Sequence, residues 1–99
     1  MKEFIKEFIG TFLRDNAEDI ADIPKSLLGT AMSTGVASMV PNNHMTPQLN
    51  NLKIKFAAEA LKHTADTKAR ADKIKAAFEK KLKTAIWAAF GEAALGALL

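Results

Sequence analysis

Four carboxylates within eight residues near the N-terminus form the chain's densest group of potential metal ligands or acid–base catalysts. They are Asp15, Glu18, Asp19 and Asp22. Paired carboxylates can bind hard cations or move protons. Their spacing is that of one polar helix face, however, and the segment lacks the glycine turn and carbonyl ligands of a calcium loop. The pattern therefore favours a solvated face, with a docking site for lysines as the next interpretation.

The histidines, His44 and His63, are the other residues whose type suits metal binding or proton transfer. His44 falls in an expected loop and His63 in a polar helical stretch, and neither has a sequence-adjacent carboxylate that would orient its ring. Because the chain has no cysteine, a disulfide, a thiolate zinc site and a cysteine nucleophile are excluded. It also lacks a glycine-rich phosphate loop and a nucleophile elbow. We therefore expect a non-enzymatic protein with no metal site and no cofactor.

A lysine-rich segment, residues 53–83, carries ten basic and four acidic groups. Opposite charges four residues apart stabilise a helix by about 0.2–0.5 kcal/mol per pair. The first interpretation is therefore a helix that supports itself and faces solvent. A phosphate-binding surface is the less favoured interpretation, because arginine, which suits bidentate phosphate contacts, is nearly absent. The pairs at this spacing are Lys62–Asp66, Asp66–Arg70, Lys68–Asp72, Lys75–Glu79 and Glu79–Lys83.

Charge is distributed unevenly along the chain. Residues 1–24 carry three basic and six acidic groups, whereas residues 25–99 carry eleven basic and five acidic groups. This asymmetry suggests that the two parts attract each other or that the basic part meets an acidic partner. Glu3 and Glu7 interrupt the first apolar stretch, which argues against a secretory signal. We expect a cytoplasmic or virion-internal protein, with a membrane surface as the alternative location.

The elements that position these groups are predicted to be helices. Apolar residues at i, i+4 and i+8 predict an amphipathic helix over residues 2–22. Pro24 either ends that helix or begins the next one. Residues 25–39 are rich in small side chains and predict a second helix, which needs close packing because glycine lowers its intrinsic stability.

A loop is predicted at residues 41–47, where Thr46 and Pro47 give a helix-start signal. Nothing forces a break between residues 48 and 98, so we expect one long helix there. Its apolar face nevertheless shifts by about a third of a turn, which indicates a change of packing partner or a break near residues 66–69. The first face holds Ile54, Ala58, Leu61 and Ala65, and the second holds Ala71, Ile74, Phe78, Leu82, Ala85 and Ala89.

Together these patterns predict a single all-α domain over residues 1–99. The expected architecture is a helical hairpin, with a kinked N-terminal helix pair packed on one long C-terminal helix at about residues 47–98. Eighteen residues are alanine, which buries little area, so the core of such a short chain is expected to be marginal. Oligomerisation, another partner or a membrane would supply the missing burial.

Candidate partner-interface residues follow from the same patterns. A helix that is apolar all round is buried in protein or lipid, and residues 84–99 approach that composition. Small residues spaced by four allow helices to approach closely, as in residues 29–37. The candidate interface residues are Phe4, Phe8, Phe12, Gly29, Ser33, Ala37, Ile86, Trp87, Phe90, Leu95 and Leu98.

These features favour a structural or assembly protein that packs with copies of itself or into a larger complex, such as a virion. One alternative is a membrane-associated protein that inserts the short apolar stretches 26–40 and 84–99, each shorter than the ~20 residues of a comfortable span. A second alternative is sequence-independent nucleic-acid binding through the lysine-rich helix. No small-molecule substrate is expected.

Overall fold

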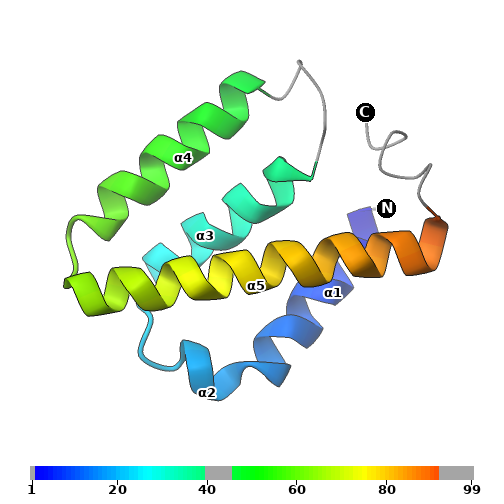
Figure 1. The fold of residues 1–99 in the computed structure, drawn as a ribbon, viewed down its shortest axis with the longest axis horizontal. Coiled ribbons are helices and arrows are strands. Elements are labelled where there is room, and N and C mark those ends of the chain that lie inside the picture. The colour runs from blue at the N-terminus through cyan, green and yellow to red at the C-terminus, as the bar shows by residue number, and fades with distance from the viewer. Residues whose placement is uncertain (1, 40–45, 92–99) are drawn as a thin grey trace.

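The computed structural model describes residues 2–39 and 46–91, and this part of the chain contains only helices (Figure 1). The all-α class predicted from helical periodicity is therefore confirmed. The helices are α1 (Lys2–Asp15), α2 (Ala17–Ile20), α3 (Lys25–Ser38), α4 (Thr46–Ala60) and α5 (Ala65–Phe90).

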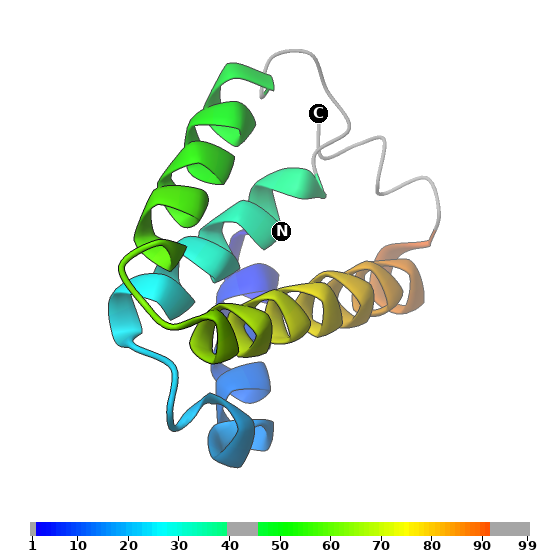
Figure 2. The ribbon, with the colours of Figure 1, turned by 60° about the vertical axis from the view of Figure 1, so that its left-hand side comes forward.

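Helix α3 lies between α4 and α5 and packs against both (Figures 1 and 2). After its first residue α3 carries no charged side chain, so it can be enclosed without stranding a charge. Leu27, Ala31 and Thr34 are fully buried, and the Thr34 hydroxyl donates to the Thr30 carbonyl at 2.7 Å. Helix α1 crosses α5, and α2 lies on the side of α5 away from α4 (Figures 1 and 2).

The core centres on Phe78 of α5, whose side chain is completely buried. Its ring centroid lies 5.8 Å from that of Phe8 and 5.2 Å from that of Phe12, so two phenylalanines of α1 dock on it. Phe8 and Phe12, which the sequence suggested as partner-interface residues, therefore pack on the C-terminal helix of the same chain. The α5 residues buried with Phe78 are Ala71, Ile74, Leu82 and Ile86.

The first predicted helix, over residues 2–22, is interrupted at Asn16, and α1 therefore ends earlier than predicted. The side-chain amide of Asn16 donates to the Phe12 carbonyl at 2.9 Å, and α2 follows directly. Pro24 then precedes α3 in an extended conformation, with φ −55° and ψ 140°. Pro24 therefore lies at the N-cap of α3, where its missing N–H leaves no helical hydrogen bond unmade.

The prediction of one unbroken helix over residues 48–98 is wrong at residues 61–64, where α4 ends and a turn leads into α5. The hydroxyl of Thr64 accepts the N–H of Thr67 at 3.2 Å and so caps the new helix. The break precedes the region near residues 66–69 where the face shift suggested one. The predicted loop residues 41–45 and helix residues 92–98 lie outside the described residues, and Thr46 already belongs to α4.

Candidate interaction surfaces

Three of the predicted interface residues belong to the chain's own core. Phe12, Ala37 and Ile86 are at most 5% exposed, so this structure does not offer them to a partner. Gly29 and Ser33 are exposed, and Ser33 lines an apolar groove of about 390 Å³ between α1, α3 and α4. Leu95, Leu98 and the side chain of Phe90 lie outside the part that the structure describes.

Phe4 and Phe8, both half-buried, line an open groove where α1 meets the end of α5. The core-facing stripe of α5 continues through half-buried Ala85 to exposed Ala89, so part of an apolar packing face is left open there. The groove has a volume of about 440 Å³. We call it the α1–α5 groove, and its lining residues are Phe4, Glu7, Phe8, Thr11, Ala85, Ala88 and Ala89.

A second apolar surface lies on α4, where the sequence predicted a packing face. Ile54 is 66% exposed and Leu61 84% exposed, with exposed Ala58 between them. Helix α4 instead buries Phe56 and Ala60 against the core. We call Ile54, Ala58 and Leu61 the α4 ridge. The face shift noted in the sequence was its signal, since the ridge and the buried stripe of α5 are the two displaced faces.

The α4 ridge ends at the turn that leads into α5, whereas the α1–α5 groove is lined by residues in the last turns of α5. Leu61 belongs to the turn that leads into α5, whereas Ala89 lies in the last turn of that helix. At a rise of about 1.5 Å per residue, Ala65 and Ala89 are separated by about 36 Å. One copy of the chain therefore presents an apolar projection at one end and an apolar groove at the other.

The solvent-facing side of the C-terminal half of α5 combines lysines with the single tryptophan of the chain. Trp87 is 44% exposed, and the Lys83 ammonium lies 5.1 Å from its ring centroid. Within the described ranges, neither Lys80 nor Lys83 forms an ion pair. Among the described residues, this face therefore has lysines without a carboxylate partner beside a partly exposed aromatic ring.

The N-terminal carboxylates face basic groups of α5 rather than forming a metal cage. Asp22 forms an ion pair with Arg70 at 3.0 Å, and Glu18 and Asp19 line a cavity with Arg70 and Lys73. Docking on the basic segment was the second interpretation of these carboxylates, and in this structure the partner is the same chain. Among the described residues, no group of three His, Asp or Glu side chains is arranged to hold a metal ion.

The predicted spacing of charges on α5 produces real ion pairs. Lys68 and Asp72 lie 3.0 Å apart, and Lys75 and Glu79 lie 2.6 Å apart. Asp66 pairs with Arg70 at 3.2 Å. Lys62 pairs instead with Glu59, at 3.3 Å, because the break after α4 interrupts the helical spacing from residue 62 to residue 66. These pairs, of which Lys75–Glu79 is partly buried, support their helices locally.

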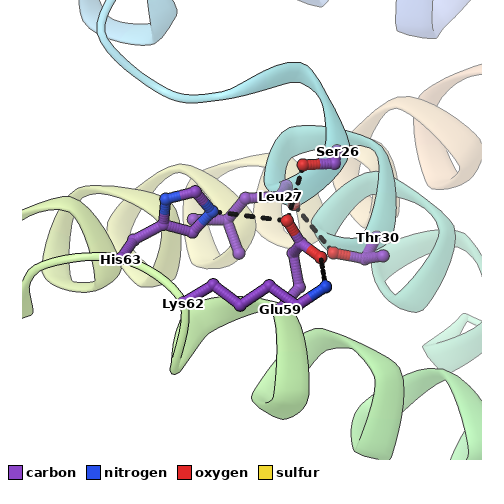
Figure 3. Close-up of polar contacts among 6 residues, drawn as sticks. All are labelled: Ser26, Leu27, Thr30, Glu59, Lys62 and His63. Carbon is purple, nitrogen blue, oxygen red and sulfur yellow. Dashed lines mark hydrogen bonds and ion pairs between the residues drawn. The ribbon is translucent and has the colours of Figure 1, made fainter.

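Glu59 joins α3, α4 and the turn after α4 through one carboxylate, an arrangement that the sequence analysis missed (Figure 3). Its Oε1 accepts the Ser26 hydroxyl at 2.6 Å and lies 3.3 Å from Nε2 of His63. The carboxylate beside His63 is therefore not sequence-adjacent but lies one helical turn earlier in the chain. The spacing of four residues between Glu59 and His63 was the available signal.

The Glu59 cluster has serine, histidine and a carboxylate but not the order of a hydrolytic triad. A nucleophilic serine needs its hydroxyl hydrogen-bonded to the imidazole, whereas Ser26 donates to Glu59 itself. The hydrogen bond from Ser26 has the largest effect on the pKa of the Glu59 carboxyl, followed by that from His63, and both lower it. The cluster therefore holds an ionised carboxylate that fastens α3 to the end of α4.

No family model, curated protein or solved structure matches this chain. Function must therefore be argued from the surfaces themselves. No helix in residues 2–39 and 46–91 has both the length and the apolar composition to cross a membrane. Residues 26–38 of the predicted inserting stretch 26–40 lie in α3, whose apolar side chains pack in the centre of the bundle.

Proposed function

We propose that this chain is a structural protein that associates with copies of itself through apolar surfaces on its helices. The observation that carries the proposal is the α4 ridge. Ile54 and Leu61 project on the same side, seven residues apart, and most of each side chain is exposed. Single exposed aliphatic residues are common, but a continuous apolar strip on an otherwise charged surface is typical of an interaction site.

The energetics indicate that the ridge needs a complementary surface. Full burial of an aliphatic side chain contributes about 1.5–3 kcal/mol. Association costs about 4–15 kcal/mol in lost translational and rotational freedom, so two side chains alone give weak binding. A stable assembly must therefore use a shaped apolar surface opposite the ridge, and the α1–α5 groove is such a surface on the same chain.

The experiment is light scattering after size-exclusion chromatography over a range of protein concentrations. We expect the wild-type mass to rise above that of the monomer with concentration. The double variant Ile54→Gln/Leu61→Gln should shift this rise to at least about tenfold higher concentration. Ala69→Gln, a substitution at an exposed position of α5, is the control, and its mass should depend on concentration as that of wild type does. A wild-type chain that stays monomeric throughout contradicts the proposal.

A second candidate function, peripheral binding to an anionic membrane, is favoured by the lysine face of α5. Lysines near an anionic surface contribute about 1 kcal/mol each, and tryptophan prefers the membrane–water interface. Lys80, Lys83 and Trp87 supply both features. This mode leaves the bundle folded, unlike insertion of α3.

Trp87 is the only tryptophan, so its fluorescence reports on this candidate directly. Vesicles that contain phosphatidylserine should shift its emission to shorter wavelength, and Lys80→Glu/Lys83→Glu should abolish the shift. The control Lys53→Glu/Lys55→Glu makes the same change in charge at exposed positions of α4, and its Trp87 emission should still shift with vesicles. Lysine-dependent, salt-sensitive binding of an oligonucleotide, with no response to vesicles, would favour the nucleic-acid alternative instead.

A further inference from the structure

We infer that copies of this chain associate head to tail, with the α4 ridge of one copy seated in the α1–α5 groove of the next. The inference rests on the proposed self-association and names the two surfaces that meet. The ridge is a projection, since Leu61 stands 84% exposed on the turn after α4. The groove is a concave surface lined by phenylalanine and alanine side chains at the other end of the molecule.

The groove has the size and chemistry to receive the ridge. Its volume of about 440 Å³ exceeds the ~30 Å³ that a water molecule occupies in the liquid by an order of magnitude, so it has room for aliphatic side chains. Alanines at positions 85, 88 and 89 make its α5 wall low. Low walls let a second helix approach closely, while Phe4 and Phe8 supply apolar area on the α1 side.

Charge at the two surfaces is complementary. Exposed Lys55 flanks the ridge, as does Lys62, whose side chain is 70% exposed and is paired with Glu59 at 3.3 Å. Glu7 lines the groove and is exposed on α1. Opposite charges at the rim of an apolar contact steer association and fix its register more than they add affinity. The same charges oppose ridge-to-ridge pairing, which would bring lysines together.

Geometry requires the contact to form between copies. The ridge lies on α4 and the turn before α5, whereas the groove is lined by α1 and the last turns of α5, so the ridge does not occupy the groove of its own bundle. A contact between two different surfaces is heterologous, and it produces a ring if the rotation closes and a filament if it does not. Each added copy leaves one free ridge and one free groove, so assembly proceeds beyond the dimer.

Mixing two variants, each of which lacks one of the two association surfaces, tests the inference. The ridge variant is Ile54→Gln/Leu61→Gln, and the groove variant is Ala89→Glu, which places a charge in the groove next to Glu7. Each changes only exposed positions, so far-ultraviolet circular dichroism should match wild type. Ala69→Glu, an exposed position on the same helix outside the groove, is the matched control for charge and should associate as wild type.

We expect each variant alone to be monomeric at concentrations where wild type forms species larger than a dimer. An equimolar mixture should form a dimer and nothing larger, because the ridge variant retains a groove and the groove variant retains a ridge. Light scattering and native mass spectrometry, with one variant isotopically labelled, would identify that heterodimer.

The contrary outcomes separate the two proposals. If wild type associates but the mixture stays monomeric, like surfaces pair or other surfaces are used, and the head-to-tail inference fails while self-association stands. If wild type is monomeric at every concentration, both proposals fail.

Discussion

Gly35 of α3 lies directly against the ring of Phe78 on α5. A Cβ atom at residue 35 would be 2.7 Å from Cδ2 of Phe78, well inside van der Waals contact. Phe78 cannot move away, because it is completely buried and the rings of Phe8 and Phe12 pack on it. The glycine therefore sets how closely the central helix approaches α5.

Gly35→Ala is expected to destabilise the protein despite alanine's better helix propensity. Overpacking a buried site costs about 1–3 kcal/mol, and replacing a helical glycine recovers at most about 1 kcal/mol. We expect a net loss of about 1–2 kcal/mol in the free energy of unfolding, measured by urea denaturation. Gly29→Ala is the control, since nothing lies within 4 Å of its added Cβ, and it should gain about 0.5–1 kcal/mol. Equal gains at both glycines would disprove the close contact.

Phe78→Ala should be the most damaging single truncation in the core. Removal of a buried phenylalanine ring costs about 3–5 kcal/mol, a large part of the about 5–15 kcal/mol that stabilises a domain. Leu61→Ala removes an aliphatic side chain that is 84% exposed, and should change stability by less than about 0.5 kcal/mol at concentrations where the protein is monomeric. Comparable losses for the two variants, measured by thermal denaturation, would show that the burial pattern is incorrect.

The helical periodicity of apolar and charged residues was enough to predict features that lie along a single face of one helix. The buried stripe through Ile74, Phe78 and Leu82 follows directly from helical spacing, as do the ion pairs of α5. Periodicity does not reveal which of two apolar faces has a partner, so Ile54 and Leu61 could not be assigned to the surface. The close-packed glycine was also missed, because residues 29, 33 and 37 fit the spacing better than residue 35.

The helix break was missed because small local terms decide it. An N-cap hydrogen bond contributes only about 1 kcal/mol, and no proline or glycine marks residues 61–64. Thr64 followed by Asp66 was the available start signal, since a hydroxyl at the N-cap and an acid in the first turn both suit a helix N-terminus. The Glu59 cluster was missed for a related reason: its Ser26 contact spans 33 residues.

Thr64→Ala should therefore weaken the start of α5. Loss of the hydrogen bond from the Thr67 N–H costs about 0.5–2 kcal/mol, measurable as a lower urea midpoint. Thr84→Ala is the matched control, because the Thr84 hydroxyl donates to the Lys80 carbonyl within the same helix and alanine is the better helix former. We expect Thr84→Ala to be neutral or slightly stabilising. A Thr64→Ala variant as stable as wild type would mean that another group caps α5.

Glu59→Gln tests the carboxylate that fastens α3 to α4, and its signature is a dependence on pH. The Ser26 hydroxyl, and then His63, lower the pKa of Glu59 in the folded protein. A carboxyl with a lowered folded-state pKa stabilises the fold above its unfolded-state pKa of about 4.3, and this contribution disappears as pH falls through the folded-state value. We expect Glu59→Gln to lower the melting temperature at pH 7.

As pH falls through the lowered folded-state pKa of Glu59, the difference in melting temperature between Glu59→Gln and wild type should narrow, because the wild-type carboxyl becomes protonated. Glu7→Gln, at an exposed position of α1, controls for the general loss of a negative charge. Ser26→Ala should lower the melting temperature at pH 7 by part of the same amount. The double variant Ser26→Ala/Glu59→Gln should lose less than the sum of the two single losses, since both substitutions remove the same hydrogen bond. A difference in melting temperature that does not narrow as the solution is acidified, or additive losses, would show that Glu59 acts through packing and not through its ionised contact with Ser26.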